Sequence, residues 1–199
     1  MNPPLAPEDV IRATRVWIEH AVIGLNLCPF AKAVYVKEQI RYVASPATTA
    51  DELLTELERE LRYLAQADPA EVDTTLLIHP QALTDFLEYN DFLDVADRAV
   101  RRLRLAGVIQ IASFHPDYRF AGTAADDVTN YTNRSPYPML HLLREASVAR
   151  AVAAFPDAGE IYGRNMETLR RVGVEGWPKP AGAGRECGTD PNRGPLSDP

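Results

Sequence analysis

The spacing of apolar residues along the chain predicts an alternation of helices and strands. Apolar positions that recur every three to four residues are typical of helices, and short β-branched or aromatic runs between turn-forming residues are typical of strands. The predicted helices cover residues 7–25, Thr49 to Asp68, 81–106 (with a break near Tyr89), 136–155 and Asp157 to Gly173. The predicted strands cover residues 34–43, 73–80 and 108–114.

This order, α-β-α-β-α-β-α-α, predicts an α/β fold. Strand–helix–strand units usually make parallel pairs with right-handed crossovers. We therefore expect a compact sandwich, with a small and mainly parallel sheet of about three strands between flanking helices. Residues 1–177 would form one domain. Residues 178–199 hold five prolines and four glycines, which predicts a disordered C-terminal tail.

The composition narrows the classes of partner. Hydrophobic residues make up 46% and charged residues 25% of the chain, as in ordinary globular proteins. The formal net charge of −7 argues against nucleic-acid binding, which needs a basic face. The sequence shows no apolar run that could span a membrane, no signal peptide, and two widely separated cysteines. We therefore expect a cytoplasmic protein whose partner is a small polar or anionic molecule.

Two of the predicted strands end in the same dipeptide, His79-Pro80 and His115-Pro116. In open parallel sheets, ligands bind outside the carboxyl ends of the strands, so parallel and neighbouring strands would bring both imidazoles to one site. Two imidazoles can bind a divalent metal such as zinc or iron, or act as a general acid and base. The alternative is that each proline ends its strand and each ring caps a nearby carbonyl group.

The loop 115–137 is long and rich in aromatic and polar residues. Loops longer than about 12–15 residues in compact domains are usually functional or disordered, and the aromatic residues favour function. Asp117 is a candidate third metal ligand or a partner that orients His115. Arg119 is a candidate substrate contact. Asp126-Asp127 could bind a cation, although turn and cap chemistry is the favoured alternative.

The start of the predicted fourth helix carries further candidates. His141 and Glu145 are four residues apart, on one side of that helix, where they would be either metal ligands or a surface pair. Asn133, Arg134 and Ser135 lie at its N-terminus, where free backbone N–H groups and the helix dipole attract anions. Arg134 could hold the carboxylate or phosphate of a substrate with two parallel hydrogen bonds, and ordinary helix capping is the alternative.

Cys28, in the run NLCPFAK, has two interpretations. If the first helix frays there, the negative end of its dipole would raise the pKa of the thiol and leave Cys28 inert. If Pro29 begins a short helical turn, Cys28 would be its N-cap and a thiolate would be stabilised, with help from Lys32. Cys28 would then be a nucleophile that His79 or His115 activates.

Three longer runs, NLCPFAKAV, SFHPDYRF and TNRSPYPMLHLLRE, resemble a bacterial family of conserved single-domain proteins of unknown function. The resemblance extends over residues 8–176. It implies one cytoplasmic domain and assigns no catalytic residue.

Three functions are therefore open. The first is an enzyme acting on a small polar or anionic metabolite through His79 and His115, by metal-dependent hydrolysis, oxidation or acid–base chemistry. The second is a small-ligand-binding or accessory protein without turnover, in which Arg134 holds the ligand and the histidines are structural. The third is a thiol enzyme that uses Cys28.

Overall fold

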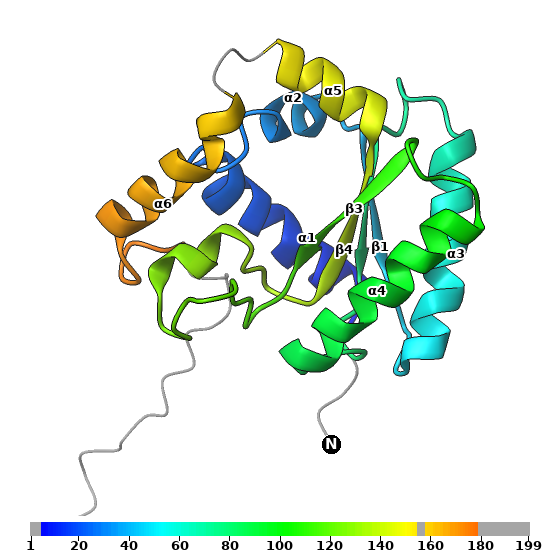
Figure 1. Ribbon diagram of the computed structural model, residues 1–199, viewed down its shortest axis with the longest axis horizontal. Helices are drawn as coiled ribbons and strands as arrows, with labels where there is room; N and C mark the ends of the chain where they lie inside the picture. The colour runs from blue at the N-terminus through cyan, green and yellow to red at the C-terminus, as the bar shows by residue number, and fades with distance from the viewer. Residues whose placement is uncertain (1–4, 155–157, 179–199) are drawn as a thin grey trace, which may run out of the picture.

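The computed structural model describes residues 5–154 and 158–178, and it contains a four-stranded sheet with helices on both faces (Figure 1). The predicted α/β class is confirmed. The predicted tail lies outside the described residues except for Pro178. The helices and strands are, in chain order, α1 (Pro7–Trp17), the π-helix η1 (Ile18–Ile23), α2 (Ala31–Val36), β1 (Ile40–Ala44), α3 (Ala50–Gln66), β2 (Thr74–Ile78), α4 (Phe86–Arg102), β3 (Ile109–Phe114), the 3₁₀-helix η2 (Val128–Thr132), β4 (Met139–Arg144), α5 (Glu145–Ala153), the 3₁₀-helix η3 (Ala158–Glu160) and α6 (Ile161–Val172).

The sheet is mixed rather than mainly parallel. Its strand order is β1-β2-β4-β3, so β4 lies between β2 and β3. Strands β1 and β2 are parallel, whereas β4 is antiparallel to both of its neighbours. Strands β2 and β3 consequently run in the same direction and end at the same edge, although they are not neighbours. The prediction of about three strands was wrong because it omitted β4.

Strand β4 and helix α5 replace the single helix predicted for residues 136–155. The run MLHLLR is rich in residues that favour helices, and it lacks the alternation of a half-exposed strand. It is apolar on both faces because β4 is an inner strand: Leu140 and Leu142 face one layer of helices, and Met139 faces the other. A short run of this kind cannot be distinguished from a buried helix by periodicity.

The first strand begins later than predicted because a short helix takes up part of the segment 34–43. Helix α2 is followed by a residue in the left-handed conformation, Glu38, whose φ is 56°. The N–H of Glu38 bonds to the carbonyl of Tyr35, and the N–H of Gln39 bonds to that of Val34, which is the pattern of a Schellman cap. Glycine usually occupies that position, so a glutamate gives no signal in the sequence.

The other helices follow their local signals closely. Thr49 and Glu52 form the predicted capping box at the start of α3. Helix α4 begins after Asp85, whose carboxylate caps it, and continues through Tyr89 without the predicted break. The predicted first helix is α1 followed by η1. None of the helices in the described residues is both long and apolar enough to cross a bilayer.

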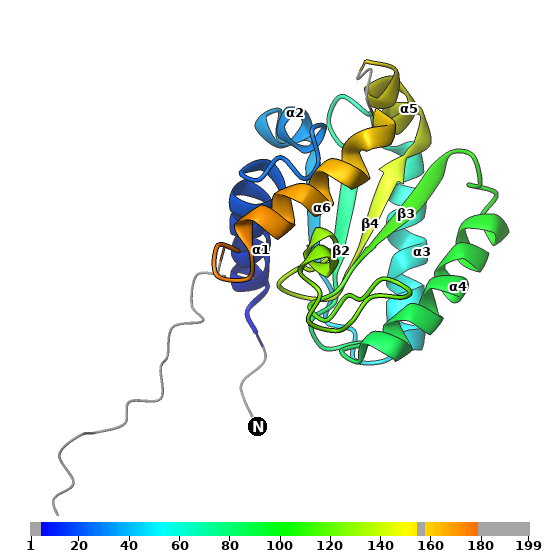
Figure 2. The same ribbon diagram turned by 60° about the vertical axis from the view of Figure 1, so that its left-hand side comes forward.

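The helices form two layers around the sheet. Helices α3 and α4 cover one face, and α1, α2 and α6 lie on the other side (Figures 1 and 2). Leucines of α3 and aromatic and small residues of α4 pack on Leu77 and Leu140 of the sheet. Trp17 and Ile18 pack with Leu76 and Met139 on the opposite face. Burial of these side chains supplies the main stabilisation of both layers.

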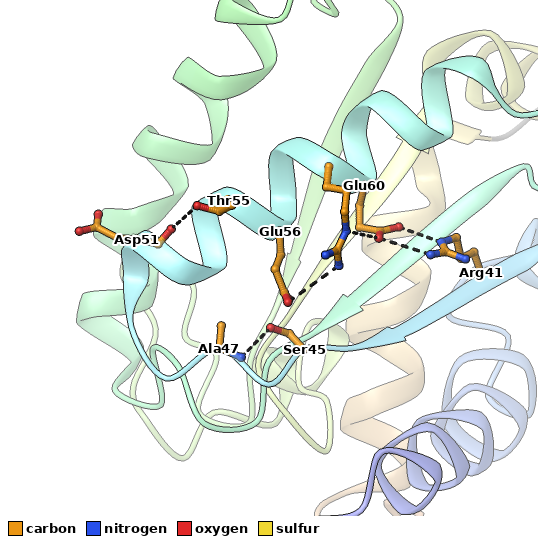
Figure 3. A network of polar contacts seen from close by, with 8 residues as sticks. Arg41, Ser45, Ala47, Asp51, Thr55, Glu56 and Glu60 are labelled. Atoms are coloured by element: carbon orange, nitrogen blue, oxygen red, sulfur yellow. Dashed lines mark hydrogen bonds and ion pairs between the residues drawn. The ribbon is translucent and has the colours of Figure 1, made fainter.

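A polar network fixes α3 to the edge strand β1 (Figure 3). Glu60 is 1% exposed, and its carboxylate accepts a hydrogen bond of 2.8 Å from Nε of Arg41. Nε of Arg59 lies 3.4 Å from the same carboxylate, and Arg59 also approaches Glu56. The two guanidinium groups offset the cost of burying a carboxylate under the sheet.

Candidate functional site

His79 and His115 lie at the shared carboxyl edge of β2 and β3, and both are 0% exposed. Their rings contact the same aromatic side chain, Tyr89 of α4. The ring centroid of Tyr89 is 5.8 Å from that of His79 and 5.1 Å from that of His115. The structure therefore brings these two histidines to one cluster on the α4 side of the sheet, although β4 separates their strands.

Backbone hydrogen bonds give the two rings opposite protonation patterns. Nδ1 of His79 lies 2.9 Å from the carbonyl oxygen of Ala82, so it carries the proton and Nε2 has a free lone pair. Nδ1 of His115 accepts a hydrogen bond of 3.0 Å from the N–H of Asp117, so the proton of the neutral ring is on Nε2. Among the described residues, neither Nε2 atom has a hydrogen-bond partner.

Burial keeps both imidazoles neutral. It lowers the pKa of His79 to about 4. Burial also lowers the pKa of His115, against the opposing effect of the Leu83 and Thr84 carbonyl groups and of the Asp117 carboxylate. The pair thus presents one hydrogen-bond acceptor and one donor without net charge at neutral pH.

The histidine pair is enclosed by aromatic side chains and by the turn before α4. The ring of Phe86 is 5.5 Å from that of His115 and 5.3 Å from that of Tyr118. In the same turn Leu83 has a φ of 53°, a conformation that costs a non-glycine residue on the order of 1–2 kcal/mol. A substrate would reach the histidine pair only after these aromatic side chains or this turn moved.

His141 and Glu145 do not join this cluster, and the prediction that they share one side of a helix is wrong. His141 is the third residue of β4 and pairs with Leu76, so it faces the α1 side of the sheet. Its Nε2 lies 2.6 Å from Oγ1 of Thr74, and burial lowers its pKa to about 4. Glu145 begins α5 at the opposite edge of the sheet, where its N–H bonds to the carbonyl of Val108.

The described residues contain no group of three or more histidine, cysteine or acidic side chains that could hold a metal ion. Asp117 contacts His115 through its backbone N–H, and its side chain is exposed. Asp126 and Arg119 are also exposed. Asp127 caps η2 by accepting hydrogen bonds from the N–H and hydroxyl of Thr129, which is the cap chemistry favoured for this pair.

Side-chain amides of Asn130 and Asn133 hold the loop 115–137 in place. Oδ1 of Asn130 accepts hydrogen bonds from the N–H of Phe120 and the hydroxyl of Thr123, and its Nδ2 donates to the Ala124 carbonyl. Nδ2 of Asn133 donates to the carbonyl of Ser113 in β3. The loop is therefore a defined structure that can shape a binding surface.

Arg134 does not precede a helix, so the predicted anion site at a helix N-terminus is wrong. Its Nε donates to the carbonyl of Tyr118 at 3.3 Å, and an Nη donates to that of Ala125 at 2.6 Å. The guanidinium also lies 4.6 Å from the ring centroid of Tyr131. The hydroxyl of Ser135 donates to the Tyr137 carbonyl. These contacts fix Arg134 in the loop rather than at a helix end.

Arg134 lines a cavity of about 240 Å³ on the α1 side of the sheet, which we call the Arg134 pocket. One other predicted site residue, Ser135, lines the pocket, and Pro116, the residue that follows His115, lines it as well. The full lining is Val16, Trp17, His20, Pro116, Tyr131, Arg134, Ser135, Pro136, Trp177 and Pro178.

Sequence reasoning missed the aromatic part of this pocket. Trp17 belongs to the apolar stripe of α1, Tyr131 to η2, and Trp177 to the segment after α6. Each residue has an ordinary packing role when its own segment is considered. No local pattern indicates that three distant segments meet.

A larger cavity, of about 320 Å³, lies between the turn after η1 and helix α6. Asn26 and Arg171 are among its lining residues, and the buried Asn165 donates from Nδ2 to the carbonyl of Leu27. No buried side-chain polar atom of the described residues around this cavity lacks a hydrogen-bond partner. We therefore consider this cavity a weaker candidate for a ligand site than the Arg134 pocket.

Cys28 lies in the turn between η1 and α2, and residues of these two elements pack on the α1 face of the sheet, whereas the histidine pair lies on the α4 face. The N–H groups of Phe30 and Ala31 favour its thiolate, as the turn interpretation expects, but burial outweighs them and raises the pKa of the thiol. Lys32 is exposed. The structure does not bring Cys28 and the two histidines together. The second cysteine, Cys187, lies outside the described residues.

Comparison with known proteins supports the resemblance seen in the sequence. The model of a family described as a protein of unknown function, DUF1415, matches residues 9–179. No curated protein and no solved structure matches the chain. Because the family match covers most of the chain, the protein belongs to the DUF1415 family, whose function is unknown.

Proposed function

We propose that the protein binds a small anionic molecule in the Arg134 pocket. The observation that carries this proposal is the charge of Arg134. None of the ion pairs among residues 5–154 and 158–178 includes it. A partly buried guanidinium without a carboxylate partner is electrostatically incomplete, and an anionic ligand supplies the missing charge.

The hydrogen bonds of Arg134 support a binding role over a purely structural one. Two of its N–H groups donate to the carbonyls of Tyr118 and Ala125, and Tyr131 supports the plane of the guanidinium. Within the described residues the other N–H groups of Arg134 have no hydrogen-bond partner, so they can hold a carboxylate or a phosphate. Because the side chain is already fixed, little conformational entropy is lost when a ligand binds.

A second polar side chain lies at the pocket. His20, which is exposed, is one of its lining residues. The indole N–H of Trp17 has no hydrogen-bond partner among the described residues, but it is sealed from solvent, so the Trp17 ring contributes an apolar surface to the pocket.

Titration of the purified protein with benzoate and with inorganic phosphate, followed by calorimetry, tests this proposal. We expect saturable binding of at least one probe, and a loss of tenfold or more in Arg134→Ala. Arg119→Ala is the matched control, because Arg119 is an exposed arginine of the same loop outside the pocket lining. Binding that is absent in the wild type, or equal in Arg134→Ala, would reject the proposal.

A variant that fills the pocket guards against loss of binding through misfolding. Val16 lines the pocket from α1 and takes no part in the hydrogen bonds of the loop. Val16→Phe is expected to abolish binding and to keep the far-ultraviolet circular dichroism of the wild type. Unchanged affinity in this variant would mean that the probe binds elsewhere.

An enzyme that uses His79 and His115 is the second candidate, favoured by their unpartnered Nε2 atoms. The opposite protonation patterns suit an acid–base pair, in which His115 donates and His79 accepts a proton. A shared zinc or iron ion is less well supported, because Nε2 of His115 carries the proton while Nδ1 accepts from Asp117. The Cys28 alternative has the least support, since its pKa is raised.

Metal analysis distinguishes the forms of this second candidate. Stoichiometric zinc or iron in the purified protein, lost in the combined His79→Ala and His115→Ala variant, would support the metal-dependent form. If the purified protein contains no metal, and chelators and added metals leave its thermal stability unchanged, only the acid–base version of the histidine enzyme remains. The proposal in either version includes a cytoplasmic location, which cell fractionation tests.

A further inference from the structure

The lining of the Arg134 pocket has a composition that its charge alone does not explain. We infer that its ligand is a planar aromatic carboxylate, an inference that rests on the function proposed above. Three aromatic residues, three prolines and a valine surround a single permanent cation. The aromatic residues are Trp17, Tyr131 and Trp177, and the prolines are Pro116, Pro136 and Pro178.

The aromatic walls stand at steep angles to one another. The rings of Tyr131 and Trp177 are 4.9 Å apart at 68°, so they form two adjoining walls instead of a parallel stack. A flat ligand in this corner can stack on one ring and meet the other with its edge, which are the two preferred geometries of aromatic pairs. The guanidinium of Arg134 lies over the Tyr131 ring, 4.6 Å from its centroid, so the cation is next to these walls.

The polar groups of the pocket are few and unevenly placed around these walls. The three prolines contribute no backbone N–H, so the walls that they form offer no donor. The available side-chain donors are those of Arg134 and the imidazole of His20. A sugar phosphate would leave most of its hydroxyl groups without partners here, whereas an aromatic acid has one charged end and an apolar ring.

The size of the pocket indicates how many rings the ligand has. Cavities that bind drug-sized molecules usually measure about 300–1,000 Å³. The Arg134 pocket, at about 240 Å³, lies below that range. A carboxylate with one ring or one fused ring system fits within this volume.

The sequence provides a direct optical test. The chain contains two tryptophans, and both of them line the Arg134 pocket, so the intrinsic tryptophan fluorescence reports on this site. Benzoate and cyclohexanecarboxylate have the same charge and similar size, and they differ in whether the ring is flat and aromatic. We expect benzoate to bind about tenfold more tightly, as aromatic contacts with two rings imply. Calorimetry measures both affinities, and benzoate binding should also change the fluorescence.

Variants connect this preference to the walls. Trp177→Leu is expected to weaken benzoate binding about fivefold or more and to leave cyclohexanecarboxylate binding unchanged. Tyr162→Leu is the control, because Tyr162 is an exposed aromatic residue outside the pocket lining. A preference that survives Trp177→Leu unchanged would overturn the inference.

The probes separate failure of the inference from failure of the proposed function. Equal binding of benzoate and cyclohexanecarboxylate, or tighter binding of inorganic phosphate, would overturn the aromatic inference and keep anion binding at Arg134. If no probe binds, both fail. Benzyl alcohol, which has the ring without the charge, should bind at least tenfold more weakly than benzoate, and equal binding would reject the role of Arg134.

Discussion

The hydroxyl of Tyr89, in α4, donates a hydrogen bond of 2.9 Å to the backbone carbonyl of Met139 at the start of β4. The same oxygen accepts a hydrogen bond of 3.0 Å from the N–H of Phe114 at the end of β3. One buried hydroxyl thus bridges the backbones of β3 and β4 where these antiparallel strands pair, next to His79 and His115. Burial raises the pKa of its phenol, so the hydroxyl stays protonated.

Removing this hydroxyl should destabilise the protein. Tyr89→Phe leaves a buried carbonyl and a buried N–H without their partner, so we expect the free energy of unfolding to fall by about 1–3 kcal/mol. Urea denaturation measures the change. Tyr63→Phe, at a tyrosine that is 43% exposed, is the matched control and should change stability little. Equal effects of the two substitutions would contradict the bridging role of Tyr89.

Stability should fall on mild acidification. Burial holds the pKa of His79 near 4, whereas a histidine of the unfolded chain titrates near about 6.5. The unfolded state therefore binds more protons between these values. His79 therefore leaves the free energy of unfolding unchanged above about pH 6.5. Between about pH 6.5 and pH 4 it lowers that free energy by about 1.4 kcal/mol per pH unit. His141, with a pKa of about 4, adds to the same window.

Urea denaturation at about pH 7, 6 and 5 tests this linkage. In His79→Gln the dependence on pH should be weaker than in the wild type, because one of the groups responsible is absent. A free energy of unfolding that stays constant from pH 7 to 5 would show that the histidines do not remain neutral in the fold.

A glycine at position 38 should stabilise the protein. Glu38 is exposed and occupies the left-handed position of the cap after α2, at a φ of 56°. Glu38→Gly relieves that strain, and we expect a gain of about 1 kcal/mol in the free energy of unfolding. Lys37→Gly is the control: its φ is −82°, so glycine brings only its entropic cost and should destabilise. Loss of stability in Glu38→Gly would contradict the cap geometry.

The Cys28 thiol should react slowly. Its raised pKa lowers the fraction of thiolate, and the side chain is only partly exposed. In a Cys187→Ser background, alkylation of Cys28 by iodoacetamide at about pH 7.5 should be at least tenfold slower in the folded protein than in urea. Peptide mass spectrometry measures the rates. Faster alkylation in the folded state would revive the thiol-enzyme alternative.

The elements that could be predicted from the sequence are those whose signals are local. The capping box of Thr49 marks α3, and the apolar runs before His79 and His115 mark β2 and β3. Strand β4 could not be predicted, because its helical composition is overridden by burial between two other strands. The start of β1 was predicted too early for a related reason. The left-handed cap after α2 is occupied by a glutamate instead of a glycine, so the sequence does not indicate that a helix ends there.

The candidate site was only partly predictable for the same physical reason. That His79 and His115 share an edge follows from the direction of their strands. Which face of the sheet each side chain meets depends on the register and on the insertion of β4, which no local pattern reveals. This insertion places His141 on the opposite face. The pocket around Arg134 depends on contacts between α1, the loop and the segment after α6.

The position of β4 has a consequence for how the chain is made. Among the strands of the described residues, β3 pairs only with β4, and β4 is the last of them to leave the ribosome. Until residue 144 emerges, β3 has no partner in the sheet and one side of β2 lacks its neighbour. Nascent chains at this stage carry unpaired apolar strands, which are targets for chaperones and for aggregation. Emergence of this six-residue segment from the ribosome therefore gives both β2 and β3 their missing neighbour at once.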